Sequence, residues 1–420
     1  MPSFNEALAS KFSATRLRSV EICEPLTIED HVIQPTEDAS PPKWHLAHTT
    51  WFFETFLLKP YLPDYQVFSE AYEYLFNSYY NGIGEQFPKS KRGTLSRPTV
   101  DEVRRYREYV DQAMQRLLAR ELNEELTFRM TLGFHHEQQH QELMLTDVKY
   151  NLGHNPLYPV YREQAIPRSS SSVTEPIKYR SIDGGVFDIG HAPPASKQFV
   201  FDNESPRHKV FVSDYKIANR VVTNGDYLSF IEDGGYEAPG HWMSDAWSLL
   251  VSAEGFRQPL YWVYNDGGWF EYTFAGLLPL VLDNPVTHVS AYEADAYARW
   301  AGARLPTEQE WEIAASRLTD TSGNFYESGR LHPSPLGVGG QDQFFGDVWE
   351  WTSSSYGPYP GFQTFPGQLG EYNGKFMANQ LVLRGGSCVT SSEHIRITYR
   401  NFFYPKDRWQ FSGIRLAKDQ

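Results

Sequence analysis

The chain has 420 residues, a formal net charge of −14 and 40% hydrophobic residues. This length predicts two domains, and the acidic balance argues against a nucleic-acid partner, because nucleic-acid-binding proteins gather Lys and Arg on one surface. Its two cysteines, Cys23 and Cys388, lie far apart, and neither a signal-like start nor a long apolar stretch is present, so we expect a cytoplasmic protein without disulfides or a membrane partner.

Helical patterns dominate the first part of the chain. Apolar residues recur at helical spacing in four segments, residues 4–18, 38–58, 99–121 and 123–151. Thr99 and Glu102 have the spacing of a capping box at the start of the third segment, and Gly153 is a typical C-terminal cap for the fourth. We therefore predict a four-helix bundle over residues 1–165. Bundle interiors are places where facing side chains build metal sites.

A long irregular stretch, residues 60–98, separates the second and third helices. Loops of this length are usually functional or disordered, and the aromatic residues here argue against disorder. After a Ser-rich linker at 166–176, short strand-like runs with many Gly and Pro follow, with helices expected only at 292–302 and after Thr307. The domain at 177–420 is therefore predicted to be irregular, and the whole chain to be a two-domain α+β protein.

Two histidines on the fourth helix form half of a metal site. His136 and His140 are four residues apart, so both imidazoles lie on one face of a helix. A third ligand is expected from the second helix, which carries His45 and His48. These two are three residues apart and share a face, so spacing alone does not choose between them.

The same segment also contains the His-Glu-x-x-His pattern of zinc hydrolases, with Glu137 as the base. The extended forms of that pattern need further ligands, which the sequence after His140 does not offer. His135 is rotated by about 100° from His136 and is interpreted as a surface or supporting residue. Three-histidine sites with open positions suit both iron and zinc, so the ligand type leaves the metal undecided.

Five motifs follow one another in the second domain, at residues 182–190, 203–208, 304–312, 346–351 and 383–387. Their order resembles formylglycine-generating-enzyme-like domains, whose fold is similar to a C-type lectin. The first domain resembles DinB-like bundles. The fusion of the two resembles the ergothioneine-biosynthesis sulfoxide synthases and the related ovothiol synthases, and the matching residues are the histidines His48, His136 and His140, the pair Tyr79 and Tyr80, and residues 399–405.

This resemblance implies a non-haem iron(II) enzyme that uses O2 to join a thiol to the imidazole of N-alpha-trimethylhistidine (hercynine) as a sulfoxide. It implies His48, His136 and His140 as iron ligands. It also implies Tyr79 or Tyr80, with Tyr80 favoured, as the donor of a proton or hydrogen atom. The ovothiol branch, which takes plain histidine, is the alternative within the resemblance, and a lectin-like binding module is a third hypothesis that leaves the histidines unexplained.

Charged residues near the predicted metal site are candidates for binding the thiol substrate. Lys89 and Arg92 lie in the long loop, and a cation there would anchor the carboxylate of an amino-acid thiol, with Arg92 as the main anchor. Free cysteine is favoured over gamma-glutamylcysteine, because the dipeptide needs two well-spaced cations for its two carboxylates. Gln139 is a candidate to hydrogen-bond the second imidazole nitrogen of the acceptor.

Near the C-terminus, Asn401, Phe402 and Phe403 suit the betaine end of the acceptor. A trimethylammonium group cannot donate hydrogen bonds and therefore relies on aromatic faces. Formylglycine-generating enzymes proper use a cysteine pair, whereas Cys388 stands alone in this region. The second domain is therefore expected to bind substrate rather than to carry their chemistry.

Overall fold

A computed structural model describes residues 4–167, 175–192, 199–252, 255–336 and 342–420. The chain divides into two units. The first comprises residues 1–161 together with 365–372, and the second comprises residues 162–364 and 373–420. Most of the predicted linker at 166–176 lies outside the described residues. The segment 365–372 is distant in sequence from the helices with which it is grouped.

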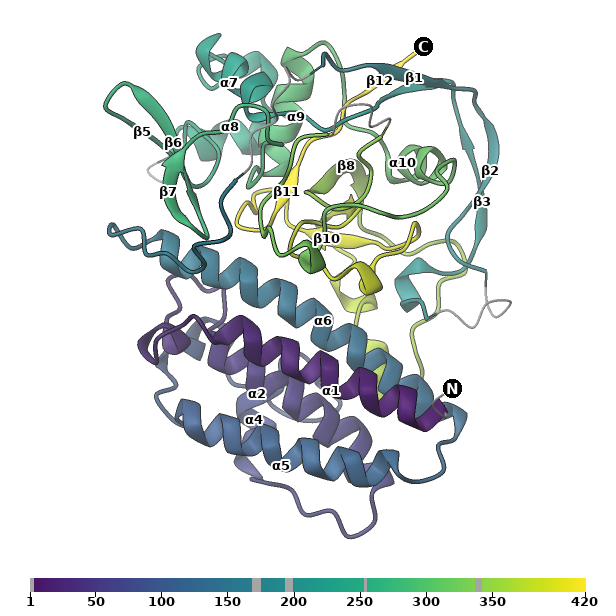
Figure 1. The fold of residues 1–420 in the computed structure, drawn as a ribbon. Helices are drawn as coiled ribbons and strands as arrows, with labels where there is room; N and C mark the ends of the chain where they lie inside the picture. The colour runs from purple at the N-terminus through teal and green to yellow at the C-terminus, as the bar shows by residue number, and fades with distance from the viewer. Residues whose placement is uncertain (1–3, 168–174, 193–198, 253–254, 337–341) are drawn as a thin grey trace. The chain divides into compact units, whose positions relative to one another are not determined.

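The first unit is helical. Its helices are α1 (Phe4–Cys23), α2 (Pro42–Phe53), α3 (Lys59–Tyr61), α4 (Ala71–Phe76), α5 (Val100–Leu118) and α6 (Glu124–Gly153). The long helices α1, α2, α5 and α6 run side by side in Figure 1, and α2 packs against both α5 and α6. The predicted four-helix bundle is confirmed, with α2 as its central helix.

Local sequence signals explain where these helices begin and end. Thr99 and Glu102 form the predicted capping box, since the Thr99 hydroxyl accepts from the Glu102 N–H at 3.2 Å and the Glu102 carboxylate accepts from the Thr99 N–H at 2.6 Å. Helix α2 begins at Pro42, later than expected, because proline is favoured in a first turn and the preceding Pro41 is extended. The long loop at 60–98 contains α4 and a 3₁₀ turn at Lys89–Thr94.

The second unit combines short strands with four short helices among its described residues. The strands are β1 (Tyr179–Ile182), β2 (Gly185–Ile189), β3 (His208–Val212), β4 (Tyr215–Ala218), β5 (Trp262–Asn265), β6 (Gly268–Thr273), β7 (Gly276–Pro279), β8 (Trp349–Ser355), β9 (Leu381–Arg384), β10 (Asn401–Phe403), β11 (Ser412–Gly413) and β12 (Ala417–Asp419). The helices are α7 (Asn224–Glu232), α8 (Ser244–Leu250), α9 (Ala291–Trp300) and α10 (Glu308–Ala315). The sequence predicted α9 and α10, whose starts carry capping boxes, but it did not predict α7 and α8.

The strands form four small sheets rather than one large one. The orders are β10-β9-β8-β11, β1-β4-β12, β5-β6-β7 and β2-β3. In the four-stranded sheet, β9 is antiparallel to both β8 and β10, and β11 is parallel to β8. This α+β arrangement confirms the predicted fold class.

Buried ion pairs join the motifs of the second unit. Arg384 pairs with Glu312, and Arg415 pairs with Glu350 at 2.6 Å. The Trp311 indole N–H also donates to Glu350, at 2.6 Å. A buried charge is costly unless it is paired and hydrogen-bonded, so these residues hold the core of the unit together. The motifs are therefore the scaffold of the fold.

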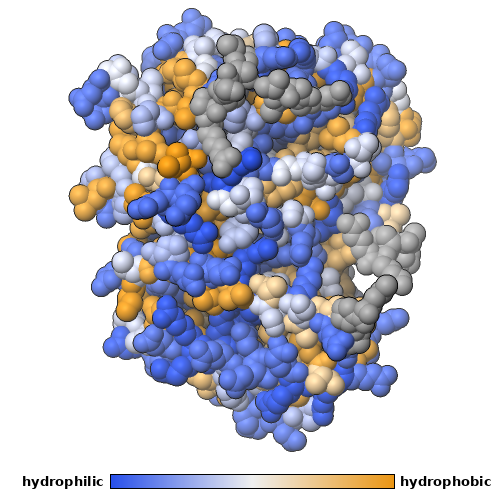
Figure 2. All heavy atoms as spheres, in the orientation of Figure 1, coloured by the Kyte–Doolittle hydropathy of each residue, from blue (hydrophilic) through white to orange (hydrophobic). Residues whose placement is uncertain are grey.

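Hydrophobic side chains are scattered in small groups on the face of the molecule seen in Figure 2. Within the described ranges, no helix has both the length and the apolar character needed to span a bilayer.

Candidate metal centre

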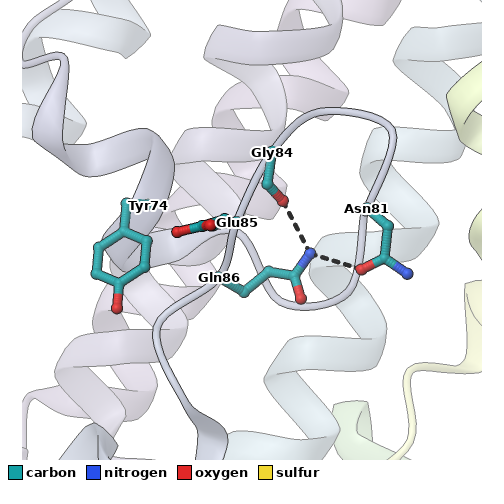
Figure 3. Close-up of a pocket in the computed structure, with 5 residues that line it drawn as sticks. All are labelled: Tyr74, Asn81, Gly84, Glu85 and Gln86. Atoms are coloured by element: carbon teal, nitrogen blue, oxygen red, sulfur yellow. Dashed lines mark hydrogen bonds between the residues drawn. The ribbon is translucent and has the colours of Figure 1, made fainter.

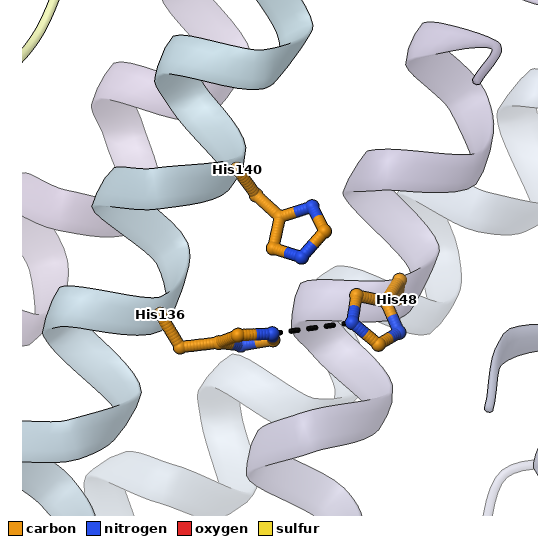
Figure 4. A group of neighbouring side chains, drawn as sticks. All are labelled: His48, His136 and His140. Atoms are coloured by element: carbon orange, nitrogen blue, oxygen red, sulfur yellow. Dashed lines mark hydrogen bonds between the residues drawn. The ribbon is translucent and has the colours of Figure 1, made fainter. Parts of the chain in front are cut away.

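Three buried histidines meet inside the helical bundle. His48 projects from α2, and His136 and His140 project from α6 toward it (Figure 4). The Nε2 atoms of His48 and His136 are 3.1 Å apart, and one ring nitrogen from each histidine lies within 4.8 Å of the others. The structure thus brings together the three residues that the family resemblance implies as ligands.

The donor set fits a divalent metal ion. Two nitrogens bound side by side at about 2.1 Å from one ion are separated by about 3 Å, which is close to the spacing between His48 and His136. The His48 Nδ1 lies 2.6 Å from the carbonyl oxygen of Phe76 and donates to it, which leaves the His48 Nε2 lone pair for a metal. Burial lowers the pKa of His48, His136 and His140 well below the usual range, so all three are neutral donors.

The remaining histidines of the two helices have other positions. His45 is buried, and its Nδ1 lies 2.9 Å from the Nδ1 of His140, the side of the ring away from the His140 Nε2. His135 is also buried, and among the described residues it is not part of the metal-ligand group. His45 therefore contacts the cluster from its outer side and is not one of its three members.

Glu137 points away from the cluster into a buried charge network. Its carboxylate accepts from Arg16 at 3.0 Å, from Ser19 at 2.6 Å and from Arg107. Burial alone would raise the pKa of Glu137, but the charges of Arg107 and Arg16 lower it below its usual range. A carboxylate that is fully occupied by two guanidinium groups does not serve as a general base, which removes the base that the zinc-hydrolase alternative needs.

Arg92 is linked to the cluster through an aromatic stack. Its guanidinium carbon lies 3.4 Å from the centre of the Trp44 ring, and Trp44 stacks on His48 with centroids 4.6 Å apart and planes 10° apart. Arg92 donates to the hydroxyls of Ser40 and Ser78, and burial lowers its pKa. A buried guanidinium bound to two neutral hydroxyls is well suited to receive a carboxylate.

Lys89 has a different environment from Arg92. Its side chain is about half exposed, and its Nζ lies 3.7 Å from the carboxylate of Asp38, which is also exposed. An exposed pair of this kind contributes little to stability. Of the two predicted cations, Arg92 is the buried one.

Tyr79 and Tyr80 lie in the loop that follows α4, and the last residue of α4, Phe76, hydrogen-bonds His48 through its carbonyl. Phe76, whose carbonyl accepts from His48, directly precedes Asn77, and the buried Asn77 side chain accepts from the Tyr80 N–H and donates to the Tyr80 carbonyl, both at 3.0 Å. The two tyrosine rings stack with centroids 4.6 Å apart. Burial, followed by the neighbouring Tyr79, raises the pKa of Tyr80 well above its usual range, so its hydroxyl keeps its proton.

A shallow pocket of about 550 Å³ lies at the same loop, lined by Tyr74, Asn81, Gly84, Glu85 and Gln86 (Figure 3). The Gln86 amide crosses the loop and donates to Asn81 at 2.9 Å and to the Gly84 carbonyl at 3.0 Å. None of the predicted site residues lines this pocket, which is separate from the histidine cluster.

The segment 365–372 adds a phenol that sequence reasoning missed. The Tyr372 hydroxyl donates to the side-chain oxygen of Gln139, and its ring lies 5.8 Å from that of His136, centroid to centroid. The neighbouring Glu371 carboxylate accepts from the N–H groups of Asn81 and Gly82, at 3.0 and 2.8 Å. This segment therefore contacts both the ligand helix and the tyrosine loop within the first unit.

The aromatic residues of β10 point to opposite faces of their strand. Phe402 stacks on Tyr356 with centroids 4.0 Å apart, whereas Phe403 packs edge-on against Trp409. The Asn401 side-chain oxygen accepts from the N–H of Phe402 at 2.9 Å. Successive side chains in a strand alternate between faces, so Phe402 and Phe403 do not form one continuous aromatic surface.

Comparison with known proteins identifies the family. A DinB superfamily model matches residues 11–145, and a model of the sulfatase-modifying factor enzyme 1-like domain matches residues 167–335 and 317–420. The hercynine oxygenase of Mycolicibacterium smegmatis is 31% identical, covering 99% of this chain and 99% of that protein. The chain belongs to the hercynine oxygenase family. The hercynine oxygenase of Mycobacterium tuberculosis is 33% identical over 90% of this chain and 91% of its own length.

A eukaryotic relative matches over part of its length. Ergothioneine biosynthesis protein 1 of Schizosaccharomyces pombe is 31% identical over 53% of this chain and 28% of its own length. Membership of the hercynine oxygenase family confirms the resemblance seen in the sequence motifs, and it makes the chain an oxygenase rather than a hydrolase or a binding module.

Proposed function

We propose that this chain is an iron(II)-dependent, O2-dependent sulfoxide synthase that joins the imidazole ring of hercynine to the sulfur of cysteine. The observation that carries the proposal is the buried cluster of three neutral histidines in a member of the hercynine oxygenase family. The overall change is balanced: one C–H and one S–H bond are lost, a C–S bond forms, one oxygen atom of O2 becomes the sulfoxide and the other leaves as water.

His48, His136 and His140 would hold the iron, and bound iron would supply the redox chemistry needed to use O2. The three histidines are neutral, so the positive charge of a bound iron ion would be compensated by anionic groups of the substrates. The acceptor imidazole is oriented by Gln139, whose side chain is in turn fixed by the Tyr372 hydroxyl. A fixed hydrogen-bonding partner next to a ligand favours one reactive geometry of the acceptor.

We assign proton or hydrogen donation to Tyr80, with Tyr79 as the alternative. Tyr80 is favoured because its buried ring stacks on Tyr79, and because the Asn77 bonds tie its backbone to the chain segment whose carbonyl accepts from His48. The raised pKa means that the phenol keeps its hydrogen until a strongly basic or oxidising oxygen species takes it.

The betaine end of hercynine is assigned to β10 and its surroundings. Phe402, stacked on Tyr356, offers an aromatic face for the trimethylammonium group, and cation-π attraction of this kind is worth about 0.5–2 kcal/mol. Asn401 supplies a polar side chain next to it, and Phe403 supports the strand through its contact with Trp409.

We assign Arg92 as the main residue that binds the carboxylate of the thiol substrate, and the exposed Lys89 as a second, weaker contact. Arg92 is the buried cation of this loop, whereas Lys89 is about half exposed. One buried guanidinium can bind one carboxylate, and cysteine has a single carboxylate, close to its sulfur. We therefore favour cysteine over gamma-glutamylcysteine as the thiol substrate.

Product analysis tests the substrates directly. The iron-loaded chain is supplied in air with equal amounts of cysteine and gamma-glutamylcysteine, together with either hercynine or histidine, and the sulfoxides are identified by mass. We expect the hercynine–cysteine sulfoxide to dominate. Predominant use of plain histidine would reassign the enzyme to the ovothiol branch, whereas predominant use of the dipeptide would overturn only the choice of thiol.

A further inference from the structure

The three histidines of the cluster differ in what binds their outer ring nitrogen. The Nδ1 of His48 donates to a backbone carbonyl, and the Nδ1 of His136 has no hydrogen-bond partner among the described residues. The Nδ1 of His140 instead lies 2.9 Å from the Nδ1 of His45. His140 is therefore the one ligand of the three whose outer nitrogen meets another ionisable side chain.

The other ring nitrogen of His45 contacts a carboxylate. The His45 Nε2 lies 2.9 Å from Oδ2 of Asp147, which is on α6 seven residues, or about two helical turns, after His140. Oδ2 of Asp147 also accepts from the backbone N–H of Ser40 at 2.8 Å. All three side chains are buried, so water does not compete for these bonds.

The Asp147 carboxylate determines which atoms donate and which accept in the two hydrogen bonds that link Asp147, His45 and His140. The Asp147 carboxylate accepts from the His45 Nε2, and a His45 ring that carries its proton there presents its Nδ1 as an acceptor. His140 must then donate from its Nδ1. A neutral His140 with its proton on Nδ1 has its lone pair on Nε2, the tautomer that a metal at the cluster requires.

We propose that Asp147 and His45 are positioning residues that hold His140 in its metal-binding tautomer and orientation and make it a stronger donor to the metal. The inference rests on the metal site of the proposed function, and it concerns residues that do not themselves contact the metal. Carboxylate partners of this kind typically change metal affinity by 10- to 100-fold.

The test measures metal binding by the full-length chain rather than turnover. Affinity for Fe(II) is measured without oxygen by competition with a chelator, and the visible absorption spectrum of the Co(II)-loaded chain reports ligand geometry. The variants are Asp147→Asn, His45→Phe and His45→Asn. In His45→Asn, the side-chain oxygen lies near the former Nδ1 and still accepts from His140, whereas His45→Phe keeps the ring but loses both bonds.

We expect Asp147→Asn and His45→Phe to weaken metal binding by about 10- to 100-fold and to change the Co(II) spectrum. His45→Asn should recover most of the loss. The matched control is His31→Phe, which removes a buried histidine of the same unit whose Nδ1 lies 2.8 Å from a backbone carbonyl, and it should bind metal as the natural chain does.

Wild-type affinity and an unchanged spectrum in Asp147→Asn and His45→Phe would overturn the inference and leave the metal site intact. Equal losses in His45→Phe and His45→Asn would also overturn it, because the bond to His140 would then not matter. Failure of the natural chain to bind iron would instead count against the proposed function.

Discussion

The hydroxyl of Tyr372 donates a hydrogen bond to the side-chain oxygen of Gln139, the residue that precedes the ligand His140. Tyr372 reaches this position on a segment more than 200 residues away from α6 in sequence. Its ring also lies 6.3 Å from that of Tyr79, centroid to centroid, in an edge-on arrangement. Three phenols, Tyr79, Tyr80 and Tyr372, thus belong to one aromatic group next to the metal ligands.

Replacing these phenols one at a time separates donation from substrate positioning. We expect Tyr80→Phe to lower the rate of sulfoxide formation by about 10²-fold or more and to divert the thiol to its sulfinate, because the proton or hydrogen donor is lost. Tyr372→Phe should mainly raise the KM for hercynine, because Gln139 loses its orienting partner. Both products are quantified by mass spectrometry, and a sulfinate increase in Tyr372→Phe alone would make Tyr372 the donor.

The Glu371 carboxylate is expected to hold the tyrosine loop in place. Glu371→Ala removes both acceptor oxygens for the Asn81 and Gly82 N–H groups, so amide hydrogen exchange at these two positions should become faster. Glu371→Gln keeps one acceptor and should have a smaller effect. The control is Glu85→Ala, an exposed carboxylate of the same loop. Unchanged protection in Glu371→Ala would show that the segment does not restrain the loop.

The local parts of the site could be predicted from sequence. Helical spacing places His136 and His140 on one face, and caps mark where α5 and α6 begin. Only the family motif favours His48 over His45 as the third ligand. The structure gives the reason: the His48 Nε2 faces the Nε2 of His136, whereas His45 contacts the outer nitrogen of His140.

The remaining parts depend on contacts distant in sequence. No local pattern in residues 365–372 indicates that Tyr372 packs near His136, because tertiary contacts of a short loop leave no periodicity. Phe402 and Phe403 form an apolar run too short to reveal strand alternation, so their separation onto opposite faces of β10 was not visible. The buried partners of Glu137 come from α1 and α5, and spacing within α6 does not show them.

Glu137 is expected to stabilise the fold rather than to catalyse. Glu137→Gln leaves the buried Arg107 without its carboxylate, and breaking a buried pair in this way costs about 3–5 kcal/mol. Urea unfolding of the metal-free chain measures the loss. On the same helix, Glu125→Gln breaks an exposed pair with Arg129 and should cost less than about 1 kcal/mol. Equal stability of the two variants would contradict the role assigned to Glu137.

Arg92 is expected to determine the affinity for the thiol. Arg92→Ala should raise the apparent KM for cysteine about tenfold or more, because a charge-assisted hydrogen bond to the carboxylate is lost. Metal content is measured alongside, since Arg92 stacks on Trp44 and Trp44 on His48. Lys91→Ala, an exposed cation next to Arg92, should leave the KM unchanged. An unchanged KM in Arg92→Ala with full metal content would show that the carboxylate binds elsewhere.

The most direct test is the dependence of product formation on iron and O2. The metal-free, zinc-loaded and iron(II)-loaded chains are prepared without oxygen, given hercynine and cysteine, and mixed with a known amount of O2 while sulfoxide and remaining O2 are measured. We expect only the iron-loaded chain to form product, with one sulfoxide for each O2 consumed. Equal sulfoxide formation by the zinc-loaded or metal-free chain, or none by the iron-loaded chain, would contradict an iron-dependent sulfoxide synthase.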